Sequence, residues 1–424
     1  MQIVRYPAPE QWPSIIERPY HDNRSLQQSV QGILEQVKSE GDGALLRFAG
    51  QFDGVELRGI EVPEAAFAAA EAALPGALKE AIRQAAANIE AFHERQRSIE
   101  EPVETQPGVR CWRRSVGIEK VGLYVPGGSA PLFSTVLMLG IPARLAGCRD
   151  VVLCTPPAKD GSVHPAILFA AALCGIRRVF RAGGAGAIAA MAYGTASIPK
   201  VHKIFGPGNQ WVTAAKQLVQ QEGVAIDMPA GPSEVCVVAD GDANPAYVAA
   251  DLLSQAEHGA DSQVLLLTNS ADLMEGVQRA LAQQLEQLPR QETARGALEG
   301  SRLVLLRDLT DAMALANAYA AEHLILQCRE AERLANDVRA AGSVFIGPWS
   351  PESVGDYASG TNHTLPTNGF ARAYSGVSLD SFVKKISFQQ LSRAGLQGIA
   401  ATVTEMAEAE GLRAHAEAVR IRLQ

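Results

Sequence analysis

The chain has 424 residues, of which 47% are hydrophobic and 20% are charged, and its formal net charge is −8. This length exceeds what one ordinary hydrophobic core accommodates, and the composition is that of a folded protein rather than a disordered one. An acidic balance without a basic tract argues against nucleic acid or an anionic membrane surface as the partner, so we expect a small-molecule ligand.

The apolar runs, the N-terminus and the cysteines indicate where in the cell the protein is located. No apolar run is long enough for a membrane span, and the N-terminus Met1-Gln-Ile-Val-Arg-Tyr6 lacks the charged-then-apolar order of a signal peptide. The six cysteines are scattered and form no CxxC pair, which argues against a disulfide framework and a thiolate zinc site. The expected location is the cytoplasm.

The first hundred residues are rich in helix signals. Residues 1–24 contain prolines and little periodicity, so we expect an N-terminal arm there. Ser25-Leu-Gln-Gln28 fits a capping box, and the apolar residues that follow keep a helical spacing until Gly41. Further helices are expected over Glu64–Leu74 and Leu78–Arg97.

From about residue 118 the chain alternates short apolar runs with helical segments, which predicts an α/β fold with parallel sheets covered by helices. Two sheet-forming blocks, 120–233 and 234–347, are consistent with two doubly wound units. The expected strands are Val121–Val125, Asp150–Cys154, Arg178–Arg181, Lys203–Phe205, Glu234–Ala239, Gln263–Thr268, Leu303–Arg307, Leu324–Gln327 and Ser343–Ile346.

The last part of the chain contains a long polar loop and a helical tail. The loop runs from Gly347 to Gly369, and loops of that length are usually functional or disordered. From Leu391 we expect two helices, the last over Val403–Leu423 or broken within it. The tail has little sequence with which to build its own core, so it is expected to dock on a larger body.

Three glycine-rich turns are candidates for phosphate binding. Gly184 to Ala189 formally fits G-x-G-x-x-A after a strand, but the acidic residue expected about 20 positions later is absent. Gly206-Pro-Gly-Asn209 leads into a helix and offers amides to a pyrophosphate, or is a tight turn. Tyr124 to Thr135 either frames an adenosine or diphosphate or only reverses the chain.

Polar residues at helical spacing suggest a metal site. Gln255 and His258 are three apart, so on one helix their side chains converge, but two ligands are too few for a transition metal. With Asp356 and His415 they make an oxygen-and-nitrogen set suited to a divalent ion. The alternative is that each is an ordinary surface or helix-end residue.

The adjacent pair Glu322-His323 is a candidate for acid–base chemistry. A carboxylate beside an imidazole can divide water activation and proton transfer between two groups of different pKa. The alternative is a solvated helix end. His363 and Glu410 are further polar candidates near the metal-ligand set, and Glu410 lies five residues before His415, across Gly411.

These stretches together resemble one family, the histidinol dehydrogenases, nearly from end to end. The resemblance is carried by long motifs in one order, namely Gly122–Val136, Ile204-Phe-Gly-Pro-Gly-Asn209, Ile226–Glu234, Leu253-Ser-Gln-Ala-Glu-His-Gly259, Ala321-Glu-His323 and Gly355-Asp-Tyr-Ala-Ser-Gly-Thr-Asn-His363. It implies NAD-dependent oxidation of L-histidinol to the aldehyde and then to L-histidine, the last two steps of histidine biosynthesis.

The resemblance also implies roles for these residues. One Zn²⁺ per subunit would be held by Gln255, His258, Asp356 and His415 and would orient the substrate. His323 would be the general base, and Glu322 would activate the water that hydrates the aldehyde. Substrate contacts would come from the four zinc-ligand positions, His323, Ser233, His363 and Glu410.

Cofactor contacts and assembly are implied in the same way. Tyr124 and Asn209 match NAD contacts, whereas Gly186 stands where the family usually has an NAD-contacting glutamine. The C-terminal helices resemble those that cross to a partner, so Glu410 and His415 would complete the neighbour's site in a homodimer. Zinc rather than another divalent ion rests on the resemblance alone.

The expected organisation has four parts, two of them incomplete Rossmann-like domains. Residues 1–24 form an arm and residues 377–424 a helical tail, both packed on the dimer partner. Residues 25–123 with 234–376 form the metal-binding and catalytic domain, and residues 124–233 form the NAD domain. Two alternative functions are a related zinc- and NAD-dependent dehydrogenase for another small alcohol, and a non-catalytic small-molecule binder.

Overall fold

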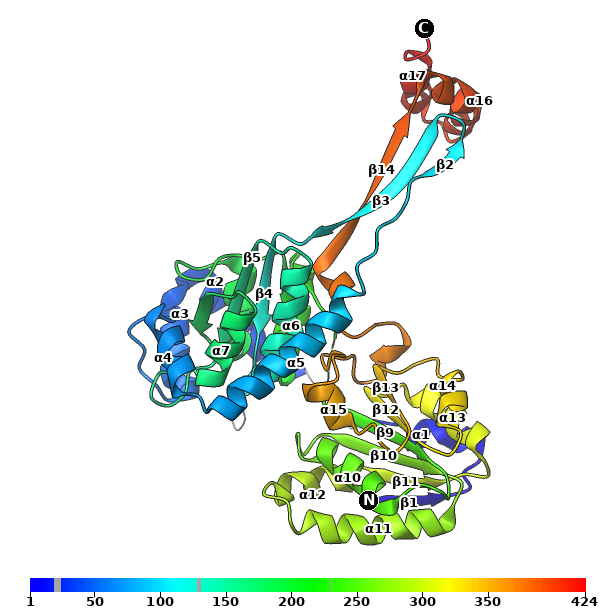
Figure 1. The fold of residues 1–424 in the computed structure, drawn as a ribbon. Helices are drawn as coiled ribbons and strands as arrows, with labels where there is room; N and C mark the ends of the chain where they lie inside the picture. The colour runs from blue at the N-terminus through cyan, green and yellow to red at the C-terminus, as the bar shows by residue number, and fades with distance from the viewer. Residues whose placement is uncertain (19–23, 128–130, 230) are drawn as a thin grey trace.

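The computed structural model describes residues 1–18, 24–127, 131–229 and 231–424. Two α/β domains lie side by side, and a long arm projects from one of them (Figure 1). The expected α/β class, with two parallel sheets, is confirmed. Among the described residues, no helix is both long enough and apolar enough to cross a membrane.

The first domain is built on a six-stranded parallel sheet. Its order is β1-β11-β10-β9-β12-β13, so β9, β10 and β11 run outward in one direction and β12 and β13 in the other. This reversal between β9 and β12 is the topology of a doubly wound sheet. The strands are β1 (Gln2–Arg5), β9 (Glu234–Ala239), β10 (Gln263–Thr268), β11 (Arg302–Leu305), β12 (His323–Gln327) and β13 (Ser343–Ile346).

Helices cover both faces of this sheet because successive side chains of a strand point to opposite sides. In β9, Val235 and Val237 pack with α10, α11 and α12, whereas Cys236 and Val238 pack with α1, α13 and α14. The helices are α1 (Trp12–Ile15), α10 (Pro245–Ala256), α11 (Ala271–Leu285), α12 (Gln291–Glu299), α13 (Leu309–Tyr319) and α14 (Ala331–Ala335).

The second domain has a five-stranded parallel sheet with the same topology. Its order is β6-β5-β4-β7-β8, which places the reversal between β4 and β7. The strands are β4 (Lys120–Tyr124), β5 (Asp150–Thr155), β6 (Arg178–Arg181), β7 (Lys203–Phe205) and β8 (Ala225–Ile226). Four helices follow or link them, namely α6 (Phe133–Leu145), α7 (Pro165–Leu173), α8 (Gly184–Tyr193) and α9 (Gln210–Gln221).

The N-terminal helices belong to this second domain, which corrects the expected grouping of residues 25–123 with 234–376. Val30 and Phe48 pack with Phe180 on one face of the five-stranded sheet, and Phe67 and Ile89 pack in the core of the other face. Helical periodicity identifies an apolar face, but not the sheet that the face covers. These helices are α2 (Arg24–Glu40), α3 (Asp42–Phe48), α4 (Ala65–Ala73) and α5 (Gly76–Glu94).

The expected N-terminal arm contains a strand and a short helix that pack within this chain. Residues 2–5 form the edge strand β1, which pairs with β11 of the same chain, and Ile15 is buried in the core beneath it. Arg18 binds the buried Glu234 with Nε and Nη2 at 2.5 and 2.8 Å. A segment this short lacks the periodicity that would reveal an edge strand, so the pairing could not be predicted from the sequence.

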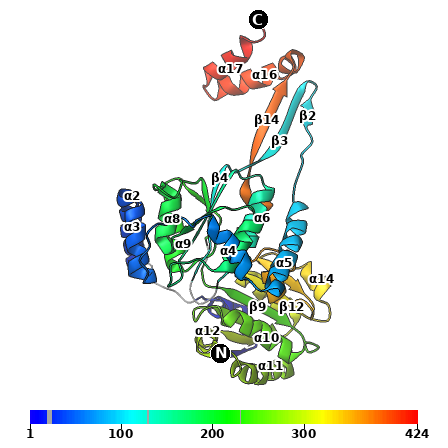
Figure 2. The same ribbon diagram turned by 60° about the vertical axis from the view of Figure 1, so that its left-hand side comes forward.

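The projecting arm is a three-stranded antiparallel sheet that carries two helices at its tip (Figures 1 and 2). The strands are β2 (Val103–Gln106), β3 (Val109–Gly117) and β14 (Val383–Leu391), and the helices are α16 (Arg393–Ala409) and α17 (Arg413–Arg420). The helical tail was expected, with a break that occurs at Gly411, where φ is +76°. Strand β14 was missed because its side chains are largely exposed and do not alternate in polarity.

Candidate functional site

Side chains that suit a metal gather at the end of α10 and on α15 (Glu352–Tyr357). Gln255 lies in the last turn of α10 and His258 in the turn that follows. One ligand atom from each of His258, Glu352 and Asp356 lies within 4.8 Å of the others. The partial negative charge at the C-terminus of a helix favours a cation, and imidazole with carboxylate and amide oxygens suits a divalent transition metal. The residues present therefore fit the expected ion.

The Gln255 amide can take part only in one orientation. Its side chain is buried, and turning the amide so that the nitrogen faces Glu352 places Nε2 3.2 Å from Glu352 Oε2. The opposite orientation would direct the amide oxygen at the two oxygens of the ionised Glu352 carboxylate, which only accept hydrogen bonds. With the nitrogen held by the carboxylate, the oxygen is free for a cation.

Glu322 and His323 lie together at the amino end of β12, both buried. His323 Nδ1 lies 3.3 Å from the Glu234 carbonyl oxygen, which can only accept, so we assign the ring proton to Nδ1. Within the part of the chain that the structure describes, His323 Nε2 is buried without a hydrogen-bond partner, 3.6 Å from Asp356 Oδ1. In the neutral ring this nitrogen carries the lone pair and can accept a proton.

Burial and neighbouring charges shift the pKa values of the acidic and imidazole groups in this cluster. Burial raises the pKa of Glu322 to about 7 and that of Glu352 to about 8. Burial by itself would lower the pKa of His323, but the carboxylates of Glu352 and Glu322 outweigh it and raise that pKa. The His258 side chain is exposed at one edge, but loss of hydration in the cluster lowers its pKa, which favours the neutral imidazole that a metal ligand must be.

His363 connects this cluster to the second domain. Its Nδ1 lies 2.9 Å from the Asp356 carbonyl oxygen, and its Nε2 lies 3.0 Å from Thr135 Oγ1 in the first turn of α6. Asn362 donates to the Met138 carbonyl of the same helix at 2.6 Å. Because α6 follows β4, these bonds tie the metal-ligand cluster to the carboxyl end of the five-stranded sheet. Ser233 directly precedes β9, beside the buried Glu234.

Glu410 and His415 are the site residues that a single chain does not bring together with the others. Both are exposed, Glu410 at the end of α16 and His415 in α17, at the far tip of the arm. Figure 1 shows these helices well away from α15, and Figure 2 shows them well away from α10. In one chain, therefore, the expected metal set lacks one of its four members.

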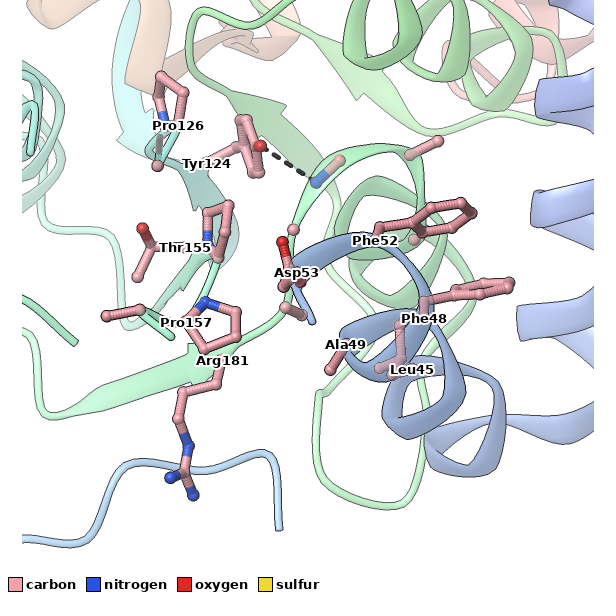
Figure 3. Close-up of a pocket in the computed structure, with 18 of the residues that line it drawn as sticks. Leu45, Phe48, Ala49, Phe52, Asp53, Tyr124, Pro126, Thr155, Pro157 and Arg181 are labelled. Carbon is pink, nitrogen blue, oxygen red and sulfur yellow. Dashed lines mark hydrogen bonds between the residues drawn. The ribbon is translucent and has the colours of Figure 1, made fainter. Parts of the chain in front are cut away.

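A cavity of about 900 Å³ opens at the carboxyl ends of β4, β5 and β6 in the second domain, beside the reversal between β4 and β7 (Figure 3). This position in an open α/β sheet is where nucleotide ligands usually bind. Tyr124, Gly186 and Asn209, the three positions predicted for cofactor contacts, all line it. Phe48, Phe52 and Asp53, at the end of α3 and in the following helical turn over Ala49–Asp53, form the opposite wall.

Some polar groups of the candidate phosphate-binding turns form hydrogen bonds within the protein. Asn209 caps α9, its Oδ1 accepting from the amides of Trp211 and Val212, and the Tyr124 hydroxyl accepts from the Gly184 amide. Gly206 has φ +130°, and a Cβ there would strike the Tyr124 carbonyl, so this turn needs glycine. In the turn from Tyr124 to Thr135, residues 128–130 lie outside the described residues.

Sequence reasoning missed two parts of the site. Glu352 is 1% exposed, although it follows a proline in a polar loop where a solvated side chain is the usual expectation. Phe52 and Asp53 belong to a helical region that ends 67 residues before the first residue of β4, the strand that carries Tyr124. In neither case does a local sequence pattern predict the role, because tertiary packing alone brings these side chains to the site.

Comparison with known proteins was consistent over the whole chain. A family model for histidinol dehydrogenase matches residues 16–423. Histidinol dehydrogenases from Bacteroides thetaiotaomicron and Xylella fastidiosa are 56% and 58% identical, covering 100% and 93% of this chain and 99% and 92% of their own lengths. The crystal structure of histidinol dehydrogenase from Elizabethkingia anophelis is 53% identical, with a TM-score of 0.98 over 100% of this chain and 98% of that one. An acetylating aldehyde dehydrogenase from Geobacillus thermoglucosidasius, 15% identical with a TM-score of 0.50 over 87% of this chain and 98% of its own, has a similar fold.

Proposed function

Because the chain belongs to the histidinol dehydrogenase family and is an oxidoreductase, we propose that it oxidises L-histidinol through the aldehyde to L-histidine, with NAD as the hydride acceptor, in histidine biosynthesis. The observation that carries the proposal is the buried His323 Nε2, without a hydrogen-bond partner among the described residues, close to the proposed metal ligands His258 and Asp356. Alcohol oxidation requires an imidazole that can take up a proton in its neutral form, next to a site that can bind a polar substrate.

The first oxidation needs a base and a hydride acceptor. His323 Nε2 takes the hydroxyl proton of histidinol while the carbon-bound hydrogen leaves as hydride to the nicotinamide, which gives the aldehyde and NADH. The Nδ1 contact with the Glu234 carbonyl keeps the ring in the tautomer that leaves Nε2 free. The surrounding carboxylates favour the imidazolium that results, because they raise the pKa of His323.

The second oxidation starts from the hydrated aldehyde. Glu322, with a pKa of about 7, is suited to accept a proton from the water that adds to the aldehyde carbon. Its Oε2 accepts from the Glu234 amide at 2.9 Å, which fixes the direction of the carboxylate. A second hydride transfer from the hydrate then gives the carboxylic acid and a second NADH.

We propose that Gln255, His258 and Asp356 hold a Zn²⁺ together with His415 of a partner subunit, in a homodimer. When bound, the ion supplies a positive centre that orients the polar atoms of the substrate. Ser233, His363 and Glu410 are the proposed additional substrate contacts, and Glu410 also comes from the partner subunit. The exposed position of Glu410 and His415 at the tip of the arm supports the shared site.

We propose that NAD occupies the cavity lined by Tyr124 and Asn209. The support is its place at the carboxyl ends of a doubly wound sheet and its link to the catalytic cluster through Thr135 and His363. Six cysteines without a disulfide are typical of a reducing compartment, which supports the cytoplasm as the location.

One assay tests the proposal. Purified protein is mixed with NAD and L-histidinol, NADH is followed by its absorbance, and histidine is identified by mass spectrometry. We expect two NADH for each histidine. No NADH with histidinol, but NADH with another small alcohol, would assign the site to a different substrate, and no turnover of any alcohol would indicate a non-catalytic binder. The matched control is His323→Gln, which removes the base and should lose both products.

A further inference from the structure

Glu352 is a buried acid to which the proposed mechanism assigns neither a proton transfer nor metal ligation. It is the first residue of α15, four positions before Asp356, so both carboxylates project from the same side of that short helix. Its side chain is 1% exposed, and Oε1 lies 3.7 Å from His323 Nδ1. A carboxylate buried this deeply is costly unless its oxygens are hydrogen bonded.

The partner of Glu352 is the amide of Gln255. With the amide nitrogen turned toward the carboxylate, Nε2 lies 2.5 Å from Oε1 and 3.2 Å from Oε2. Both carboxylate oxygens are therefore within hydrogen-bond distance of the same N–H₂ group. This contact fixes the rotation of an amide whose two ends would otherwise be nearly equivalent in shape.

The rotation of the amide decides what Gln255 offers to the site. An amide nitrogen cannot ligate a cation, whereas the amide oxygen can. Because Glu352 holds the nitrogen, the oxygen is presented on the opposite side of the group. Partners of this kind, which hold a ligand in orientation, typically contribute 10- to 100-fold to metal affinity or activity.

We infer that Glu352 is a positioning residue that orients the Gln255 amide oxygen toward the metal and acts on the ion through Gln255. The inference rests on the proposed metal site. Its distinguishing consequence is that Glu352 has no effect of its own once the amide is removed, whereas a direct ligand would contribute independently.

A double-mutant cycle on metal affinity tests this. Zn²⁺ affinity is measured by competition with a chromophoric chelator for the full-length wild-type protein, E352Q, Q255A and the double variant. We expect E352Q to weaken binding roughly 10- to 100-fold and to add nothing to Q255A. Additive effects would make Glu352 an independent ligand and overturn the inference, and so would an E352Q protein with wild-type affinity. If the wild-type protein itself binds no metal, the proposed function fails instead.

Exchanging the residue types at positions 255 and 352 provides a second test, which looks for recovery of Zn²⁺ affinity rather than for its loss. In Q255E alone two carboxylates face each other, so metal binding should be disturbed by their repulsion. Adding E352Q restores a donor–acceptor pair with the roles reversed, so the exchanged protein should bind Zn²⁺ more tightly than Q255E. No recovery would contradict the contact. Glu257→Gln, which removes a charge from the same helix end outside this contact, is the matched control and should leave Zn²⁺ affinity unchanged.

Discussion

Mixing two inactive variants tests whether two chains share each metal site. His258 belongs to the cluster on α10 and α15, whereas His415 lies in α17 at the tip of the arm. Strand β14, which leads to that tip, has nine residues, so at roughly 3.3 Å per residue it spans about 30 Å. A zinc ligand must approach to about 2 Å, so an extended arm cannot bring His415 to the cluster of its own chain.

The expected activity follows from counting sites. We combine chains that carry His258→Asn with chains that carry His415→Asn, in equal amounts, by co-refolding or co-expression. Random pairing makes about half of the dimers mixed, and one of the two sites in each mixed dimer keeps both histidines. The mixture should therefore show about one quarter of the wild-type rate, although each variant alone is inactive.

The assay is NADH formation from L-histidinol, together with zinc content after removal of free metal. Each variant refolded alone is the control for recovery caused by refolding itself. If the tail served its own chain, no site in the mixture would hold both histidines. An inactive mixture of properly paired dimers would therefore refute the shared site.

Three further changes have definite expected outcomes. His258→Asn should lose metal and activity together, checked by metal analysis and NADH formation, and activity without metal would undo its assignment as a ligand. Gly186→Gln should restore an NAD contact and lower the KM for NAD by roughly 2- to 10-fold, the value of one hydrogen bond, although Phe48 must give way because its Cδ2 lies 3.2 Å from the added Cβ; an unchanged NAD affinity would contradict this. Burial raises the pKa of Asp251 from 3.8 to about 6. Ionisation of Asp251 is therefore easier in the unfolded chain, and the free energy of unfolding falls as the pH rises from about 4 through 6. Asp251→Asn, which cannot ionise, should therefore raise the free energy of unfolding by up to about 3 kcal/mol more at pH 8 than at pH 4, measured by urea unfolding of metal-free protein, and equal effects at the two pH values would contradict the argument.

The fold class and most strands were predictable from the sequence because they depend on local patterns. Strands buried on both faces, such as Glu234–Ala239 and Gln263–Thr268, are continuous apolar runs, and the helices between them keep their period. The exposed strand Val383–Leu391 carries neither signal, since its side chains are not sorted between a core and solvent within one chain. It was therefore missed.

The motifs also identified the residue types of the site, including the pairs Gln255 with His258 and Glu322 with His323. They did not reveal Glu352, because a buried acid looks the same in sequence as a solvated one. Its environment is created by α10 and β12, which lie outside its own loop.

What the sequence determined by itself was the periodicity of each element and the chemistry that its side chains carry. Only the tertiary structure decided which sheet the helices over 24–94 cover, how His363 reaches Thr135, and that His415 stands apart from the cluster. The physical reason is that periodicity is set by neighbours along the chain, whereas the partner of an apolar face or a ligand is set by packing between segments hundreds of residues apart.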